Sequence, residues 1–240
     1  MKKTIFTEEE LFHYLKCPIH YDTIYNKQFS PSTQPNMRTL LDGVKKNFYT
    51  QLMLGKVMPT SEIKRRWDKA CEMNPDIITQ QKCLDGLGLL MKMYRWAEDM
   101  QLRIIDQDIP YSIGIDGKNG ERIDFRGHID TVAADKENEV YLLAMDFANR
   151  YPVQSYLDMK LKFSLDSYAL NTIYNKQAGI KVHHVKNNKD FYSIRKEEDY
   201  VRAKTAIANV VFAVHNKIFY PRETTFCTSC DLLHFCKAWR

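Results

Sequence analysis

The spacing of apolar residues changes along the chain, and the change separates a helical part from a sheet part. In the first hundred residues apolar positions recur every three or four residues, as at Leu87, Leu90, Met91 and Tyr94. This is the period of one buried face of an α-helix. The pattern predicts helices at about 37–56, 61–73 and 79–102.

A shorter helix near the start of the chain has signals at both ends. Thr7 is followed three residues later by Glu10, the spacing of a capping box in which each side chain bonds to the other residue's backbone. Cys17 precedes Pro18, and the residue before a proline avoids the helical conformation, so the helix should end there. Cys17 is then placed to face another segment. The polar, proline-containing stretch 30–35 is expected to be a loop.

After residue 103 the pattern becomes that of strands. Strands are predicted at 104–115, 122–133 and 139–147, separated by the turn-forming stretches 116–120 and 135–138. A helix at about 157–178 should end at Gly179, followed by two short strands at 180–185 and 191–194 and a helix at 197–217. This order predicts an α/β fold with a helical N-terminal region. We expect a single domain over 1–240, with a helical region at 30–102, a sheet core at 103–195 and a cysteine-rich tail at 221–240.

Composition adds only broad limits. Of the 240 residues 44% are hydrophobic, which is enough for a buried core and excludes a disordered chain. A net charge of +5 permits binding to nucleic acid but suits an ordinary slightly basic protein equally well. There is neither an apolar leader nor an apolar run of about 18 residues, so we expect a cytoplasmic protein with no membrane partner. The richness in Lys, Asn, Ile and Tyr suggests an AT-rich bacterial or phage genome.

Three cysteines are concentrated near the C-terminus. Cys227, Cys230 and Cys236 form a C-x2-C-x5-C group within ten residues. In a reducing compartment clustered cysteines bind metal more often than they form disulfides. Thiolates are soft ligands that suit zinc, Cu(I) and iron–sulfur clusters. A cluster with four thiolate ligands needs one more cysteine, and Cys17 is the best candidate.

Two other interpretations of the cysteines stay open at this point. The tail alone could bind zinc through three thiols and one imidazole, with the ligand set Cys227, Cys230, His234 and Cys236. Alternatively, the cysteines are free and buried. Cys71 and Cys83 fall within helical patterns and are expected in the core.

The cysteine pattern, together with the segment Leu15-Lys16-Cys17-Pro18-Ile19-His20-Tyr21, resembles one family over nearly the whole chain. It is similar to the RecB-like nucleases of the PD-(D/E)XK superfamily, in particular their iron–sulfur subgroup of AddB-type nuclease domains and CRISPR-associated exonucleases. The resemblance implies a restriction-endonuclease-like mixed sheet flanked by helices. It also implies a [4Fe–4S] cluster that joins the two ends of the chain, with the ligands Cys17, Cys227, Cys230 and Cys236.

The resemblance further implies a site for a divalent metal ion. The family's Gly-x-x-Asp motif matches residues 127–130, and its Asp/Glu-x-Lys motif aligns with residues 146–148. Asp130, Asp146 and the carbonyl of Phe147 would then hold Mg²⁺ or Mn²⁺, which favour oxygen ligands and activate water for phosphate hydrolysis. Without the resemblance, two aspartates near strand ends would be interpreted as turn or cap residues.

Three side chains of the family's site are replaced in this sequence. The motif lysine falls at Ala148. The histidine of the Gly-x-x-x-His motif, which begins here at Gly43, falls at Asn47. Of the Gln-x-x-x-Tyr motif, which begins here at Ser164, only Tyr168 is kept. Removing one electrostatic donor from such a site costs about 10²–10³ in rate, so several losses leave little activity unless another group compensates.

Lys160 and Lys162, on the helix that follows the second motif, are candidates to supply the missing charge from another backbone position. The alternative is that both are solvated charges on an amphipathic helix.

Basic residues at 45–46, 64–66, 160–162 and 186–189 suggest contacts with nucleic acid. Aromatic residues lie near several of them, and a basic groove with aromatic stacking platforms suits single-stranded DNA. These residues are Phe48, Tyr49, Trp67, Tyr94 and Trp96. The alternative places the helical aromatics in the core and the basic run at 64–66 on a solvated face.

Three functions are therefore compatible with the sequence. The first is a Mg²⁺- or Mn²⁺-dependent DNA exonuclease or endonuclease. The second is a catalytically impaired relative that binds single-stranded DNA or DNA ends as an accessory subunit, beside a helicase or another recombination or replication factor. The third is a zinc-containing protein–protein interaction module without nuclease activity.

Overall fold

The computed structural model describes residues 4–29, 35–230, 232–233 and 236. Contacts divide the chain into two compact units. The first comprises 1–33, 110–128 and 197–240, and the second comprises 34–109 and 129–196. The loop expected at 30–35 falls almost wholly outside the described residues.

The three helices predicted for the first hundred residues are confirmed in the second unit. They are α3 (Met37–Met53), α4 (Thr60–Glu72) and α5 (Gln80–Asp99). Asn36 and Thr79 cap α3 and α5, because the side chain of each accepts a hydrogen bond from the backbone N–H three residues later.

The predicted strands are also confirmed, and they form one mixed sheet. Their bounds are β2 (Arg103–Asp116), β3 (Arg122–Ala134), β4 (Val140–Asp146), β5 (Gly179–His184) and β6 (Lys189–Ser193). Pairing is antiparallel between β3 and β4, parallel between β4 and β5, and antiparallel between β5 and β6. A further strand, β1 (Ile5–Thr7), pairs in parallel with β3 and was not predicted, since three residues are too few to give a pattern. The sheet has the order β1-β3-β4-β5-β6, with β2 on β3.

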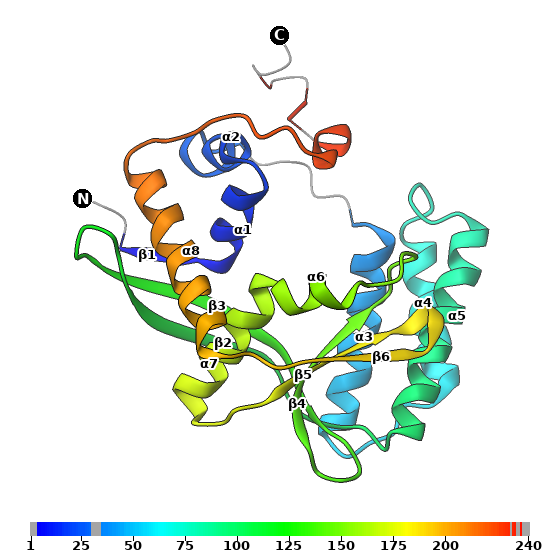
Figure 1. The fold of residues 1–240 in the computed structure, drawn as a ribbon. Helices are drawn as coiled ribbons and strands as arrows, with labels where there is room; N and C mark the ends of the chain where they lie inside the picture. The colour runs from blue at the N-terminus through cyan, green and yellow to red at the C-terminus, as the bar shows by residue number, and fades with distance from the viewer. Residues whose placement is uncertain (1–3, 30–34, 231, 234–235, 237–240) are drawn as a thin grey trace. The chain divides into compact units, whose positions relative to one another are not determined.

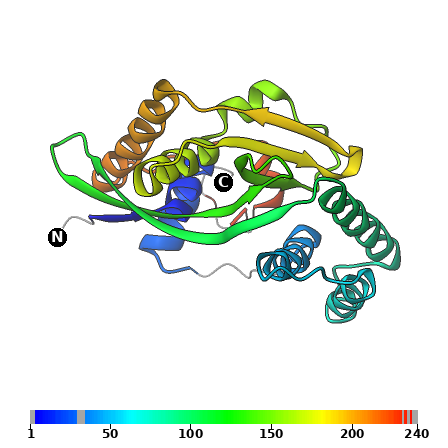
Figure 2. The ribbon, with the colours of Figure 1, turned by 90° about the horizontal axis from the view of Figure 1, so that it is seen from below.

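The second unit places helices on both faces of its strands (Figures 1 and 2). Tyr141, Leu143 and Met145, at alternate positions of β4, belong to the core cluster formed with α3, α4 and α5. Leu142 and Ala144 line a pocket together with residues of the helix that covers the opposite face. Alternate side chains of a strand point to opposite faces, so β4 is buried on both sides.

The single helix predicted at 157–178 is wrong, because two helices occupy this region. These are α6 (Gln154–Met159) and α7 (Leu161–Tyr174), separated by Lys160 in an extended conformation with ψ of 114°. The buried guanidinium of Arg195 donates a 2.7 Å hydrogen bond to the carbonyl of Leu157, a carbonyl that a continuous helix would bond to residue 161. The expected stop at Gly179 is also wrong, since α7 ends at Tyr174, its cap Asn175 lies in the left-handed region (φ 49°), and Gly179 begins β5.

Helices α4 and α5 meet at a glycine. A Cβ atom at Gly86 would lie 2.1 Å from the ring of Trp67, which is fully buried and donates a 2.7 Å hydrogen bond to the carbonyl of Cys83. Cys71 and Cys83 pack against the same core, as expected, and their sulfur atoms are bonded to each other, which the sequence pattern did not indicate.

The Gly86→Ala variant should therefore lower the free energy of unfolding by about 1–3 kcal/mol, because the added methyl group overpacks a filled core. Gly88→Ala, in the same helix, is the matched control. A Cβ there meets nothing within 4 Å, and the change should raise stability by about 0.5–1 kcal/mol. Urea unfolding followed by tryptophan fluorescence measures both, and equal shifts in the two variants would contradict the proposed close contact.

The first unit contains β1, α1 (Glu8–Lys16), α2 (Pro18–Tyr21), the π-helical turn Asp22–Asn26, α8 (Glu197–His215) and the 3₁₀ turn Thr225–Ser229. The capping box of α1 is confirmed, with Thr7 N–H donating to Glu10 Oε2 at 3.0 Å and Glu10 N–H donating to Thr7 Oγ1 at 3.3 Å. The helix ends at Lys16 with Cys17 as its cap, also as predicted. No helix in the described part of the chain combines the length and apolar character that crossing a bilayer requires.

Candidate functional site

Among the described residues of the C-terminal tail, backbone hydrogen bonds join positions that are three residues apart. The N–H of Cys230 donates to the carbonyl of Cys227, that of Leu233 to Cys230, and that of Cys236 to Leu233. These three backbone hydrogen bonds link Cys227, Cys230 and Cys236 through Leu233.

Cys17 lies with these three cysteines. All four line a single cavity in the first unit, whose other walls include Pro221, Phe226 and Leu233. Each of the four thiols is partly exposed and none is in a disulfide. The sequence therefore brings together four soft ligands from its two ends.

The tail is held against the N-terminal helices by several contacts. The Arg222 guanidinium donates a hydrogen bond to the carbonyl of Leu15, and the Tyr14 hydroxyl donates to the carbonyl of Ile218 at 2.7 Å. The ammonium group of Lys16, beside Cys17, lies 3.2 Å from the ring centre of Phe226, which is itself in the turn that carries Cys227. These contacts hold the tail against α1, beside Cys17.

Four cysteines line this apolar-walled cavity, and four cysteine thiolates are the ligand set of a [4Fe–4S] cluster. The residues present are thus of the right kind and number, although in the described part of the chain no group of three or more His, Cys, Asp or Glu side chains is already arranged to hold a metal ion. His234, the fourth ligand of the alternative zinc site, lies outside the described residues.

The two candidate metal ligands in the second unit come from neighbouring strands. Asp130 lies on β3 and is largely exposed, while Asp146 is the last residue of β4 and is partly buried. The side chain of Phe147 packs in the core, so only its backbone carbonyl remains available as a ligand. Asp146 Oδ1 accepts a 3.0 Å hydrogen bond from the N–H of Ala148, which fixes one carboxylate oxygen.

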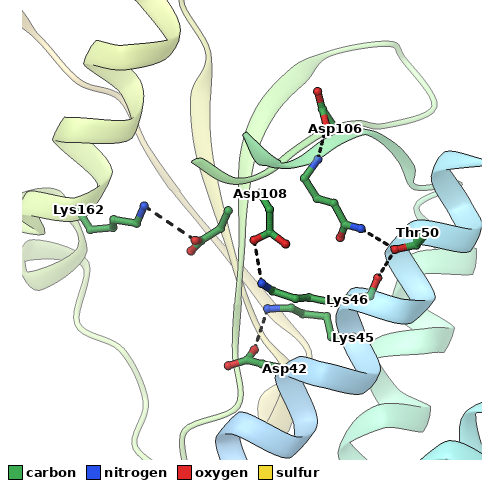
Figure 3. A network of polar contacts seen from close by, with 9 residues as sticks. Asp42, Lys45, Lys46, Thr50, Asp106, Asp108 and Lys162 are labelled. Atoms are coloured by element: carbon green, nitrogen blue, oxygen red, sulfur yellow. Dashed lines mark hydrogen bonds and ion pairs between the residues drawn. The ribbon is translucent and has the colours of Figure 1, made fainter. Parts of the chain in front are cut away.

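Lys162 on α7 is directed towards Asp130. Its ammonium lies 3.9 Å from Asp130 Oδ1 and 2.8 Å from Asp166 Oδ1, and its side chain is only 14% exposed. Figure 3 shows Lys162 pointing inward from α7, while Lys45 and Lys46 point inward from α3 and pair with Asp42 and Asp108. Lys162 is therefore a buried partner of two carboxylates and not a solvated surface charge.

Lys160 lies near both candidate metal ligands. It lines a cavity together with Asp146 and Arg38, and its charge also interacts with Asp130. Burial, assisted by the positive charge of Arg38, lowers the pKa of Lys160, and the surrounding carboxylates oppose this shift. The interpretation of Lys160 as a solvated charge is not supported by this burial.

The loop after Asp146 is held by a buried histidine. His184, paired with Asp146 across β5 and β4, accepts a hydrogen bond from the N–H of Asn187 at Nδ1, so its proton is on Nε2. From Nε2 it donates a 3.1 Å hydrogen bond to the carbonyl of Ala148. The position at which the resembled family has its lysine is thus fixed, but its side chain is a methyl group.

The remaining motif positions, at Asn47, Ser164 and Tyr168, do not line the cavities at Asp130 or Asp146. The Asn47 amide donates to the carbonyl of Gly43 in its own helix at 2.9 Å and is exposed. Ser164 is fully buried. Tyr168 is partly buried on α7 and is not among the residues that line the cavities at Asp130 or Asp146.

The helical aromatics named from the sequence do not form stacking platforms, because their side chains pack in the core, as the alternative interpretation predicted. All five of these aromatic residues are buried, namely Phe48, Tyr49, Trp67, Tyr94 and Trp96. The basic run at 64–66 is on the surface, as its alternative interpretation predicted, and pairs with acidic residues of its own helix. Exposed rings beside Asp146 come instead from Tyr151 and Tyr156. The sequence did not single them out, because neither lies directly after one of the basic runs and neither belongs to a regular helical pattern of apolar residues.

No family model matches this chain, and no curated protein matches it. Among solved structures, one described as "Crystal structure of SSO0001" aligns with 100% of this chain and 89% of its own, with a TM-score of 0.45 and 9% sequence identity. A similarity of this size carries no argument about fold family or function.

Proposed function

We propose that the protein is an iron–sulfur protein with the RecB-like PD-(D/E)XK fold, and that it hydrolyses DNA with Mg²⁺ or Mn²⁺. The observation that carries the proposal is the cavity shared by Cys17, Cys227, Cys230 and Cys236. Sequence-distant thiols gathered in this way suit an inorganic cluster that joins the ends of the chain.

In this proposal Asp130, Asp146 and the Phe147 carbonyl hold the divalent ion. Mg²⁺ is commonly bound by one or two carboxylates together with water and substrate phosphates, so this small ligand set is sufficient. When bound, the ion supplies an activated water and stabilises charge on the scissile phosphate. The two carboxylates come from adjacent strands, and Lys162 offsets part of the negative charge of Asp130 and Asp166.

Lys160 is proposed to replace the motif lysine. Its burial next to Asp146 places a cation near the reacting phosphate from the junction of α6 and α7. The Lys160→Met variant should lower the rate of DNA hydrolysis by about 10²–10³-fold, because one electrostatic donor is lost. Adding Ala148→Lys to this variant should restore part of the rate, since it returns the charge to the family's position.

Lys176→Met, at a site away from Asp146, is the matched control and should leave the rate unchanged. Turnover of a labelled oligonucleotide under single-turnover conditions measures all four proteins. A Lys160→Met rate equal to wild type would show that Lys160 is not involved.

The overall proposal is tested with protein purified without oxygen. Iron and acid-labile sulfide should be present at about four atoms each per chain. Incubation with single- and double-stranded DNA should give products only with Mg²⁺ or Mn²⁺. Protein with one zinc ion and no sulfide would support the interaction module instead.

A DNA-binding accessory subunit without activity is the second candidate. It is favoured by the methyl group at position 148 and by Asn47, whose amide bonds to its own helix. For this candidate the iron content would be the same, but DNA would be bound without being cut. The two assays together therefore separate the three functions.

A further inference from the structure

A cavity of about 480 Å³ lies next to Asp146 and is distinct from the pocket at Asp130. It is formed by α3, by the end of β4 and by the segment that leads into α6. The side chains that give it chemical character are Arg38, Arg150, Lys160, Tyr151 and Tyr156.

The cavity has an excess of positive charge. Arg150 and Lys160 have no ion-pair partner among the residues that the structure describes. Arg38 has a loose one, since its Nε lies 4.0 Å from Asp42 Oδ2. Among the described residues that line the cavity, Asp146 is the one carboxylate against three cations, and Asp130 and Asp166 act on Lys160 from outside it. This balance favours an anionic ligand that carries more than one negative oxygen, such as a phosphate group.

The same cavity offers flat aromatic surfaces. Tyr151 is fixed in orientation by rings on β5 and β6, with its ring centre 5.5 Å from that of His184 and 5.3 Å from that of Phe191. Tyr156, on α6, is 65% exposed, so one of its faces is open to a ligand. A base stacks on such rings with little dependence on sequence.

We propose that this cavity binds one unpaired nucleotide, with its phosphate between Arg150 and Lys160 and its base against Tyr156. The assignment to DNA rests on the proposed function, but the pocket itself does not. A base inside a duplex is stacked and paired, so only a single strand, a frayed end or a free nucleotide can present both its phosphate and one face of its base. The pocket would thereby favour unpaired over base-paired nucleotides as the substrate that reaches Asp146.

The test is binding of fluorescein-labelled dT12 by anisotropy in EDTA, so that no cleavage is needed. Tyr156→Ala and Arg150→Ala should each weaken binding about tenfold, and Tyr156→Phe should bind as wild type does. Binding of a blunt 12-base-pair duplex should be unchanged by Tyr156→Ala. Tyr174→Ala and Arg95→Ala, exposed residues of the same unit, are the controls and should change dT12 affinity less than about twofold.

The possible outcomes separate this inference from the proposed function. Protein that binds dT12 in this pattern but does not cut DNA supports the pocket and overturns the nuclease. Protein that cuts DNA while neither Tyr156→Ala nor Arg150→Ala weakens dT12 binding overturns the pocket. Competition by thymidine 5′-monophosphate would assign the pocket to free nucleotides as well as strands. Tighter binding of rU12 than of dT12 would replace DNA by RNA as the ligand.

Discussion

The Asp146→Asn variant is expected to hydrolyse DNA at least about a thousandfold more slowly than wild type. Asparagine is close to aspartate in shape and its carbonyl oxygen can still accept the hydrogen bond from the N–H of Ala148, so the loop should stay in place. What is lost is the negative charge that a hard divalent ion requires. Asp130→Asn should give a similar loss, because it removes the other charged ligand. Initial rates on labelled DNA at saturating Mg²⁺ measure both effects.

Asp99→Asn is the control for these variants. Asp99 is the exposed last residue of α5, and its replacement should leave the rate unchanged. The Asp146→Asn protein should also bind dT12 at least as tightly as wild type, because it removes the carboxylate from a cationic cavity. A variant that is inactive and no longer binds DNA would indicate a folding defect. One that cuts DNA at the wild-type rate would exclude Asp146 as a metal ligand.

The Cys17→Ser variant is expected to be purified without a stable cluster. Serine keeps the size of the side chain but removes the soft thiolate, leaving three ligands for four irons. Iron and sulfide per chain should fall to a small fraction of the wild-type value, and the visible absorption of the cluster should disappear. The contacts of Arg222 and Tyr14 would still hold the tail, so secondary structure measured by circular dichroism should be largely kept.

The double variant Cys71→Ser/Cys83→Ser is the matched control, because it also replaces cysteines, here the disulfide pair, but leaves the cavity of the tail intact. It should retain iron and sulfide at wild-type levels. If Cys17→Ser retained one zinc ion per chain and His234→Ala lost it, the ligand set would be the tail alone, as in the zinc alternative. Metal analysis of the three proteins distinguishes these cases.

Features encoded by a few adjacent residues were predicted well. The capping box at Thr7, the end of α1 at Cys17 and the strand at β4 each depend on short-range chemistry that the sequence displays. The gathering of the cysteines was likewise expected. It could be expected because cysteines are rare, and three of them at a short spacing suggest that they bind the same metal centre.

Features set by distant residues were not predicted. The break at Lys160 depends on Arg195, which takes the carbonyl of Leu157 from a different part of the chain, and no local signal announces it. Likewise, Tyr151 and Tyr156 became candidates only once β4 and α6 had placed them beside Asp146. The burial of aromatics such as Trp67 and Trp96 reflects tertiary packing, which overrides any pairing with nearby basic residues.

The anchoring of the tail on α1 has a consequence for biosynthesis. Cys17 is translated about two hundred residues before Cys227, Cys230 and Cys236. The four thiols can therefore come together only after the intervening chain has been made, and a product terminated before Cys227 would lack three of them. Loading of an inorganic centre at this position would then report that translation has passed Cys236.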